Sequence, residues 1–249
     1  MVEAFTRQFL YVRPGVVVIF DRVRAKRPLE IKRWYLHTMA QPQCLDGPLT
    51  PDLSVHPEGH FRAQGRVLRT AHGGSALFSR TLLPRDATIR MLGGKGHQFE
   101  VAGENYDMYE ACWQKVGTPE YQEEIGLEWW RVEVEPPRPQ AEDVFLHVLW
   151  VTDDRIGEMF PVQTLEKEGW AGARFTADGT DVEVLFATTG EVNARLKLAG
   201  QGKPICDRPL ANAVKDDYRQ WSRDARFPAW LTNAPMRAVV GRLEAGSAD

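Results

Sequence analysis

The fold is decided by residues 8–23, which read QFLYVRPGVVVIFDRV. Two runs rich in aromatic and β-branched residues, 8–13 and 16–23, lie on either side of Pro14 and Gly15. Runs of this kind around a Pro-Gly pair are typical of a β-hairpin. The second run is apolar on both faces where it begins, as expected of a strand in the middle of a sheet. The segment therefore predicts a hairpin that contains one central strand.

Outward from this hairpin, short β-rich runs continue through most of the chain. The next is 29–39, and further strands are predicted at 65–70, 75–83, 87–92, 97–101, 128–134, 144–151, 162–166, 172–176, 182–187 and 192–198. Residues 40–58 predict a long connection, and 103–126 an irregular loop. About a dozen short strands without interleaved helices predict an all-β, antiparallel, two-layer β-sandwich over residues 1–200. The remaining residues, 201–249, predict a helical or irregular tail with one helix at 210–221.

Length and charge restrict the class of protein and of partner. The chain has 249 residues, 43% hydrophobic and 26% charged, which suits one large β domain or two small ones. Its 31 basic and 34 acidic residues give a net charge of −3, so no overall positive field favours nucleic acid. No run approaches the roughly 20 apolar residues that span a bilayer. We therefore expect neither a nucleic-acid nor a membrane partner.

The cysteines and the first residues say little about the compartment. Cys44, Cys112 and Cys206 are far apart without metal-type spacing, and we interpret them as small, buried or half-buried thiols. Residues 1–7 lack the basic start and apolar core of a signal peptide. The first strand also begins almost at residue 5, an abrupt start that would leave an open sheet edge. We expect an upstream segment in the natural protein, and the localisation stays open.

The six histidines predict no metal or cofactor. None forms an HExxH or HxH motif, and Pro57 and Gly59 between His56 and His60 argue against a ligand-bearing helix, so we interpret that pair as loop surface. His147 shares one face of its predicted strand with Phe145 and Leu149, which favours a core histidine over a catalytic one.

One predicted strand combines basic and aromatic residues on a single face. Arg33, Tyr35 and His37 alternate with Lys32, Trp34, Leu36 and Thr38. Arginine can hold a carboxylate or sulfate with two hydrogen bonds, and an aromatic face can stack on a sugar ring. The strand therefore predicts a saccharide-facing surface, with a merely solvated or internally paired polar face as the alternative. Gly93-Gly94-Lys95-Gly96 lacks the ending of a phosphate loop and predicts a tight turn that places His97.

Five segments taken in order resemble the back half of the β-sandwich in heparinase II/III-like proteins. They are residues 9–23, 32–38 (KRWYLHT), 94–106 (GKGHQFEVAGENY), 130–134 (WRVEV) and 143–148 (DVFLHV), within a likeness that extends from about residue 5 to 190. The resemblance implies a parent polysaccharide lyase with an N-terminal α/α toroid, usually periplasmic or secreted, that cleaves uronic-acid-containing polysaccharides such as glycosaminoglycans by β-elimination. The toroid supplies most of that family's catalytic residues, and a His-rich opening of the sandwich supplies another histidine.

Neither the toroid nor the His-rich opening is present here, so no catalytic residue is carried over. The leading hypothesis is a lyase C-terminal module that supports the toroid and binds an acidic polysaccharide. Its candidate substrate-binding residues are Arg33, Tyr35, His37, His97 and Tyr106. The alternatives are a stand-alone, non-catalytic carbohydrate-binding sandwich, and a small complete lyase that uses His37 or His97 with Tyr35 or Tyr106.

Overall fold

The computed structural model describes residues 2–54, 58–105 and 129–210, and every regular element in them is a β-strand. The chain divides into two compact units, Met1–Phe5 with Tyr11–Phe160 and Thr6–Leu10 with Pro161–Asp249. The predicted all-β, antiparallel class is confirmed. The described part of the chain contains no helix with the length and apolar character needed to cross a membrane.

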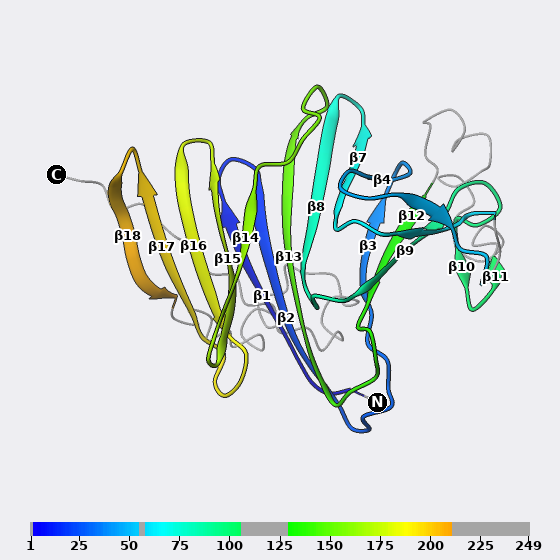
Figure 1. Cartoon of the computed structure of the whole chain (residues 1–249), viewed down its shortest axis with the longest axis horizontal. Helices are drawn as coiled ribbons and strands as arrows, with labels where there is room; N and C mark the ends of the chain where they lie inside the picture. The colour runs from blue at the N-terminus through cyan, green and yellow to red at the C-terminus, as the bar shows by residue number, and fades with distance from the viewer. Residues whose placement is uncertain (1, 55–57, 106–128, 211–249) are drawn as a thin grey trace, which may run out of the picture. The chain divides into compact units, whose positions relative to one another are not determined.

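A six-stranded sheet in the order β1-β2-β13-β8-β7-β4 belongs to the first unit, except for Thr6–Leu10 within β1. The predicted hairpin forms its first two strands, β1 (Val2–Val12) and β2 (Val16–Ala25). β2 is central, as its apolar start predicted, because β13 (Glu142–Asp153) pairs with its other edge. The remaining strands are β8 (Ser75–Leu83), β7 (Val67–His72) and the short β4 (Gln43–Cys44). Figure 1 shows β13 between β2 and β8.

The second sheet of this unit has the order β3-β12-β9-β6-β5. Its strands are β3 (Trp34–Thr38), β12 (Trp130–Glu135), β9 (Thr88–Gly93), β6 (His60–Ala63) and β5 (Leu49–Pro51). All their pairings are antiparallel. A small ladder of β10 (Glu100–Val101) and β11 (Glu104–Asn105) follows β9. Short strands β4 and β5 thus lie in the stretch predicted as one long connection.

The inward faces of the two sheets form one apolar core, which makes this unit a sandwich. The six-stranded sheet contributes Ile19, Leu68 and Phe145, and the five-stranded sheet contributes Trp34, Ala63, Ile89, Met91, Trp130, Val132 and Val134. His147 is fully buried among them, as predicted, and its ring stacks on Trp34 with centroids 3.7 Å apart. The same strand that carries Trp34 inward therefore presents its alternate residues outward.

A buried ion pair lies just before the start of β3. Lys32 Nζ is 2.8 Å from a carboxylate oxygen of Asp143, and their side chains are only 7% and 1% exposed. Lys32 also donates to the backbone carbonyls of Glu30 and Gln140, while the Gln140 amide donates to Asp143 at 2.6 Å. Charges this well shielded from water persist only when paired and hydrogen-bonded.

The second unit contains a five-stranded meander in chain order. Its strands are β14 (Val162–Lys167), β15 (Trp170–Ala177), β16 (Thr180–Ala187), β17 (Ala194–Gly200) and β18 (Lys203–Leu210). The four strands predicted between residues 162 and 198 are confirmed, and the sheet gains β18 from the stretch assigned to the tail. The predicted helix at 210–221 lies almost wholly outside the described residues. Of the three cysteines, Cys44 and Cys206 are half-buried free thiols, and Cys112 lies outside the described residues.

Arg174 and Glu183, directly opposite on β15 and β16, predict a small pH dependence. The hydrogen bonds from the Arg174 guanidinium, one of them 3.1 Å long, hold the pKa of Glu183 below its usual 4.5 despite burial. A depressed carboxyl pKa stabilises the fold above the unfolded value, and this stabilisation is lost as pH falls through the folded value. Glu183→Gln should therefore lower the free energy of unfolding by about 0.5–1 kcal/mol at about pH 7 and by less at about pH 3.

Urea denaturation of wild type and variant at the two pH values measures this difference. Glu191→Gln, a change at an exposed carboxylate in the bend before β17, serves as the control. A penalty for Glu183→Gln that grew in acid would contradict the assignment.

Candidate functional site

The outward face of the five-stranded sheet carries a group of polar residues from every one of its strands. Because the side chains of a strand alternate, the residues opposite the core on neighbouring strands form rows across this face. The rows come from β3 with the residue before it, β12, β9, β6, and β5 with the residue after it. They contain Arg33, Tyr35 and His37; Arg131, Glu133 and Glu135; Arg90; Arg62; and Thr50 with Asp52.

Tyr35, His37 and Arg131 form one end of this face. The register places Arg131 directly opposite His37, and the Arg131 guanidinium lies 5.7 Å from the centre of the Tyr35 ring. The Tyr35 side chain is nonetheless about half exposed, at 47%. Partial burial, and then the charge of Arg131, lower the pKa of His37 below its usual 6.5. The imidazole is therefore predominantly neutral at pH 7 and can both donate and accept a hydrogen bond.

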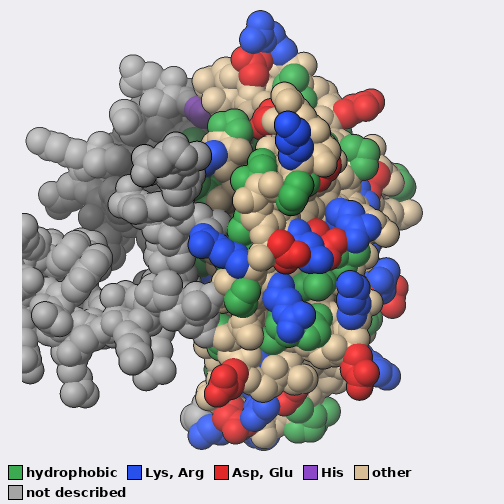
Figure 2. Space-filling view, turned by 90° about the vertical axis from the view of Figure 1, so that its left-hand side faces the viewer, with side chains coloured by type: hydrophobic (Ala, Val, Ile, Leu, Met, Phe, Trp, Pro, Cys, Tyr) green, Lys and Arg blue, Asp and Glu red, His purple; other side chains and the backbone are tan. Residues whose placement is uncertain are grey.

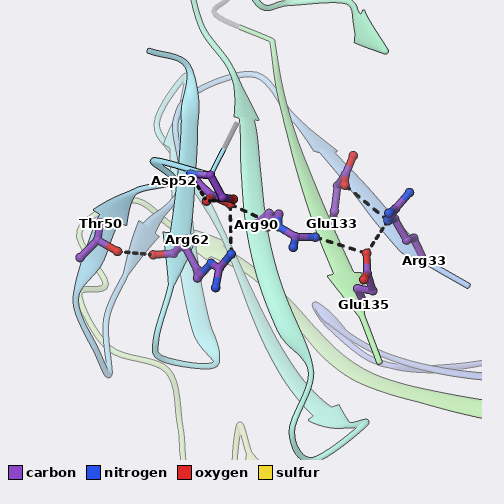
Figure 3. A network of polar contacts seen from close by, with 8 residues as sticks. Arg33, Thr50, Asp52, Arg62, Arg90, Glu133 and Glu135 are labelled. Atoms are coloured by element: carbon purple, nitrogen blue, oxygen red, sulfur yellow. Dashed lines mark hydrogen bonds and ion pairs between the residues drawn. The ribbon is translucent and has the colours of Figure 1, made fainter. Parts of the chain in front are cut away.

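A chain of ion pairs extends across the rest of the face (Figure 3). Arg33 Nε lies 2.6 Å from a carboxylate oxygen of Glu135, and Arg90 contacts the same oxygen at 3.3 Å. Arg90 and Arg62 both reach Asp52, at 3.3 and 3.4 Å. Each guanidinium is thereby held in a fixed direction by a carboxylate. These contacts link the residue before β3 to strand β6 without a break.

Asp52 anchors one end of this network. Its side chain is 4% exposed and accepts hydrogen bonds from the Ser54 hydroxyl at 2.6 Å and the Ser54 backbone N–H at 3.2 Å. These bonds lower the pKa of Asp52 below its usual 3.8, burial opposes them, and Arg62 adds to the lowering. Asp52 is therefore a fixed negative charge at neutral pH that orients two arginines.

Next to this network, two histidines meet one glutamate. His60 at the start of β6 lies within hydrogen-bonding distance of Glu100, with 2.8 Å between Nε2 and Oε2. His97, in the turn after β9, approaches the same oxygen through Nδ1 at 2.7 Å. The two imidazole rings meet edge to face, 5.6 Å between centroids. The cluster therefore converges on a single carboxylate oxygen.

The local backbone explains how these three side chains meet. The Gly93–Gly96 stretch turns the chain back after β9, and the His97 N–H donates to the Gly94 carbonyl at 2.9 Å. A Cβ added at Gly59, which has a φ of +73°, would lie 2.4 Å from the His97 ring. Only glycine therefore leaves room for that ring beside the start of β6.

The charge state of Glu100 follows from its neighbours. Burial alone would raise the pKa of Glu100, but the hydrogen bonds from His97 and His60 outweigh it and hold this pKa below 4.5. Its backbone carbonyl accepts a 2.8 Å hydrogen bond from Arg131. The cluster is thus attached to the same arginine that lies over Tyr35.

The structure brings together three of the five predicted substrate-binding residues. Arg33, Tyr35 and His37 share the outward face, as their alternation predicted. His97 belongs to the neighbouring cluster, and Tyr106 lies outside the described residues. His56 also lies outside them. The interpretation of His60 as loop surface was wrong: His60 is 4% exposed in β6, because the segment after β9 folds over it.

Several residues of the site were missed from the sequence. Arg131 had a usable signal, since WRVEV alternates polar and apolar residues as β3 does. Glu100 and Asp52 had none, because their contacts with His60 and Arg90 join segments about 40 residues apart in the chain.

Comparisons with known proteins add no identity. A search of family models found none that matches the chain, and a search of curated proteins found no match either.

Proposed function

We propose that the first unit is a non-catalytic, saccharide-binding β-sandwich that binds an acidic polysaccharide on the outward face of its five-stranded sheet. The observation that carries the proposal is the half-exposed Tyr35 ring beside Arg131 and His37, in line with a row of oriented arginines. An exposed aromatic ring offers a stacking surface for a sugar, and arginine suits carboxylate and sulfate groups.

The charge of the face is compatible with an acidic ligand. Among its described residues, four arginines stand against three carboxylates: Arg33, Arg62, Arg90 and Arg131 against Asp52, Glu133 and Glu135. The carboxylates hold the guanidinium groups in place before a ligand arrives, which reduces the entropy lost on binding. Arg62 and Arg33 keep side chains 45% and 39% exposed, so they can still reach a ligand.

The resemblance to heparinase II/III-like lyases supports the same proposal. The five segments that carry it correspond to the β1–β2 hairpin, β3, the turn through β10 and β11, β12 and β13, all strands of the two sheets and their small ladder. In such a lyase this module would support the toroid and line the polysaccharide groove. We propose binding for this face and assign no catalytic role to its residues.

Tyr35→Ala and Arg33→Gln should each weaken polysaccharide binding about tenfold, equivalent to about 1.4 kcal/mol of lost stacking or ion pairing. Affinity electrophoresis in gels that contain heparin, heparan sulfate or alginate measures the effect, with dextran as the neutral polymer. Added salt should weaken binding further, because it screens exposed charges.

Tyr11→Ala and Arg155→Gln are matched controls, since Tyr11 is 56% exposed and the Arg155 side chain 85% exposed on other elements. Equal retardation in all gels, or equal losses in the controls, would rule out this surface. Release of an unsaturated uronic product by the chain alone, followed by ultraviolet absorbance, would overturn the non-catalytic assignment and favour the small-lyase alternative.

A further inference from the structure

A cluster of two histidines and one glutamate, His60, His97 and Glu100, has the residue types and the short distances of a metal site. One donor atom from each residue lies within 4.8 Å of the other two. Two imidazole nitrogens and one carboxylate oxygen form a ligand set that Zn²⁺ accepts in proteins, at bond lengths of about 2.0–2.2 Å. Ligands of a tetrahedral ion then lie about 3.3 Å apart, so the two N···O distances of 2.8 and 2.7 Å must each lengthen by about 0.5 Å when an ion binds.

The cluster is built into the fold and is unlike a chance gathering of surface groups. His60 and Glu100 are 4% and 5% exposed, and the glycine at 59 makes the room that His97 occupies. The Arg131 guanidinium fixes the Glu100 backbone from the other side at 2.8 Å. The His97 side chain keeps 18% exposure, which leaves a path by which an ion and a water ligand can enter.

We propose that His60 Nε2, His97 Nδ1 and Glu100 Oε2 bind one divalent transition-metal ion, for which Zn²⁺ is the best match, with solvent in the fourth position. Both nitrogens must then present lone pairs, so any proton on them moves to the other nitrogen of the same ring or is released to solvent. The ion fastens the segment from His97 to β11 onto β6. The cluster borders the proposed saccharide face, because His60 pairs with Leu92 and Leu92 with Arg131 on neighbouring strands. Its three ligands are not among the residues proposed to touch the saccharide, so the metal proposal does not rest on the saccharide proposal.

The type and number of the ligand atoms favour zinc over calcium or magnesium. Ca²⁺ and Mg²⁺ prefer six or more oxygen ligands, whereas this cluster supplies two nitrogens and a single carboxylate. A three-ligand set with an open position also accepts Co²⁺, which gives the test a visible spectrum.

The test uses the full chain, stripped of metal with a chelator and then titrated with Zn²⁺ or Co²⁺. We expect one ion bound per chain, a higher midpoint of thermal unfolding with Zn²⁺, and visible absorption of tetrahedral type with Co²⁺. His60→Gln and Glu100→Gln should each lower Zn²⁺ affinity at least about 100-fold, since loss of an outer-shell partner alone costs 10–100-fold.

His72→Gln is the matched control, because His72 is an exposed histidine at the end of β7. Its zinc affinity should equal that of the wild type. His97→Gln repeats the test at the least buried ligand, and circular dichroism verifies that each variant is folded. Absence of uptake by the wild type, or uptake unchanged in folded His60, His97 and Glu100 variants, would show that the cluster is only a hydrogen-bonded triad.

Discussion

Replacement of Lys32 with methionine should lower the free energy of unfolding by about 3–5 kcal/mol, because it leaves the Asp143 carboxylate buried without its counter-charge. The Asp143 side chain is 1% exposed, so water cannot replace the ammonium group. The substitution also removes the donor to the backbone carbonyls of Glu30 and Gln140. Denaturation in urea, followed by circular dichroism, measures the change.

The double variant Lys32→Met with Asp143→Leu separates a lost pair from lost packing. Replacement of a buried ion pair by apolar side chains of similar size is often close to neutral, so the double variant should recover most of the loss. Arg24→Met is the matched control, since Arg24 pairs with Glu142 on the surface, with side chains 53% and 57% exposed. That exposed pair should contribute less than about 1 kcal/mol. Equal losses in the buried and exposed variants would contradict the burial of the Lys32 pair.

Replacement of Trp34 with alanine should also cost about 3–5 kcal/mol, the usual range when a large aromatic side chain is removed from a core. Trp34 is 3% exposed, belongs to the core between the two sheets and stacks on His147. The variant loses apolar burial and that ring contact, and it leaves a cavity beside a buried imidazole. Thermal and urea unfolding measure the loss.

Tyr35→Ala provides the internal control for this prediction, because the next residue of the same strand points to the opposite face. Its side chain is 47% exposed, and its main contact is the Arg131 guanidinium. Loss of a contact of this kind costs about 0.5–1 kcal/mol at an exposed site. Similar losses in the two variants would mean that β3 does not alternate between core and solvent as the structure has it. A stable Tyr35→Ala protein would also make the polysaccharide binding test interpretable.

The two proposed sites are neighbours that use different ligand-binding residues, so their tests can fail separately. Tyr35 contacts Arg131 on the exposed face, whereas the metal ligands meet beneath the turn that follows β9. Arg131 is the shared neighbour, since it also donates to the Glu100 carbonyl. A metal-stripped chain that still binds polysaccharide would therefore leave the saccharide proposal intact and assign the ion a structural role.

Overall charge offered little guidance to either site. The chain is nearly neutral, and Figure 2 shows basic and acidic side chains mixed on the face that it presents, without a large area of one sign. Local geometry therefore decides which arginines are available to a ligand. On the outward face that role falls to Arg33 and Arg62, the more exposed members of the network.

The alternation of residues along each strand is enough to predict which side chains face the core, before the neighbouring strands are known. It predicted the burial of His147 and the opposite faces of Lys32 with Trp34 and of Arg33 with Tyr35, while the β-rich runs around Pro14 and Gly15 predicted the hairpin at residues 8–23. These are local properties, because a side chain's facing follows from the pleat of its own strand. Which residues of another strand lie opposite is a different property, set by register and sheet order.

Only the tertiary structure decided the partners. It brought Asp143 to Lys32, Asp52 to Arg90, and Glu100 to His60, all between segments far apart in the chain. His60 appeared to belong to a surface loop because the short strand β6 has only four residues, too few to show a clear alternation. Its burial depends on the turn after β9 that folds over it. Alternation can tell which side chains face inward, but it cannot tell which of them will meet.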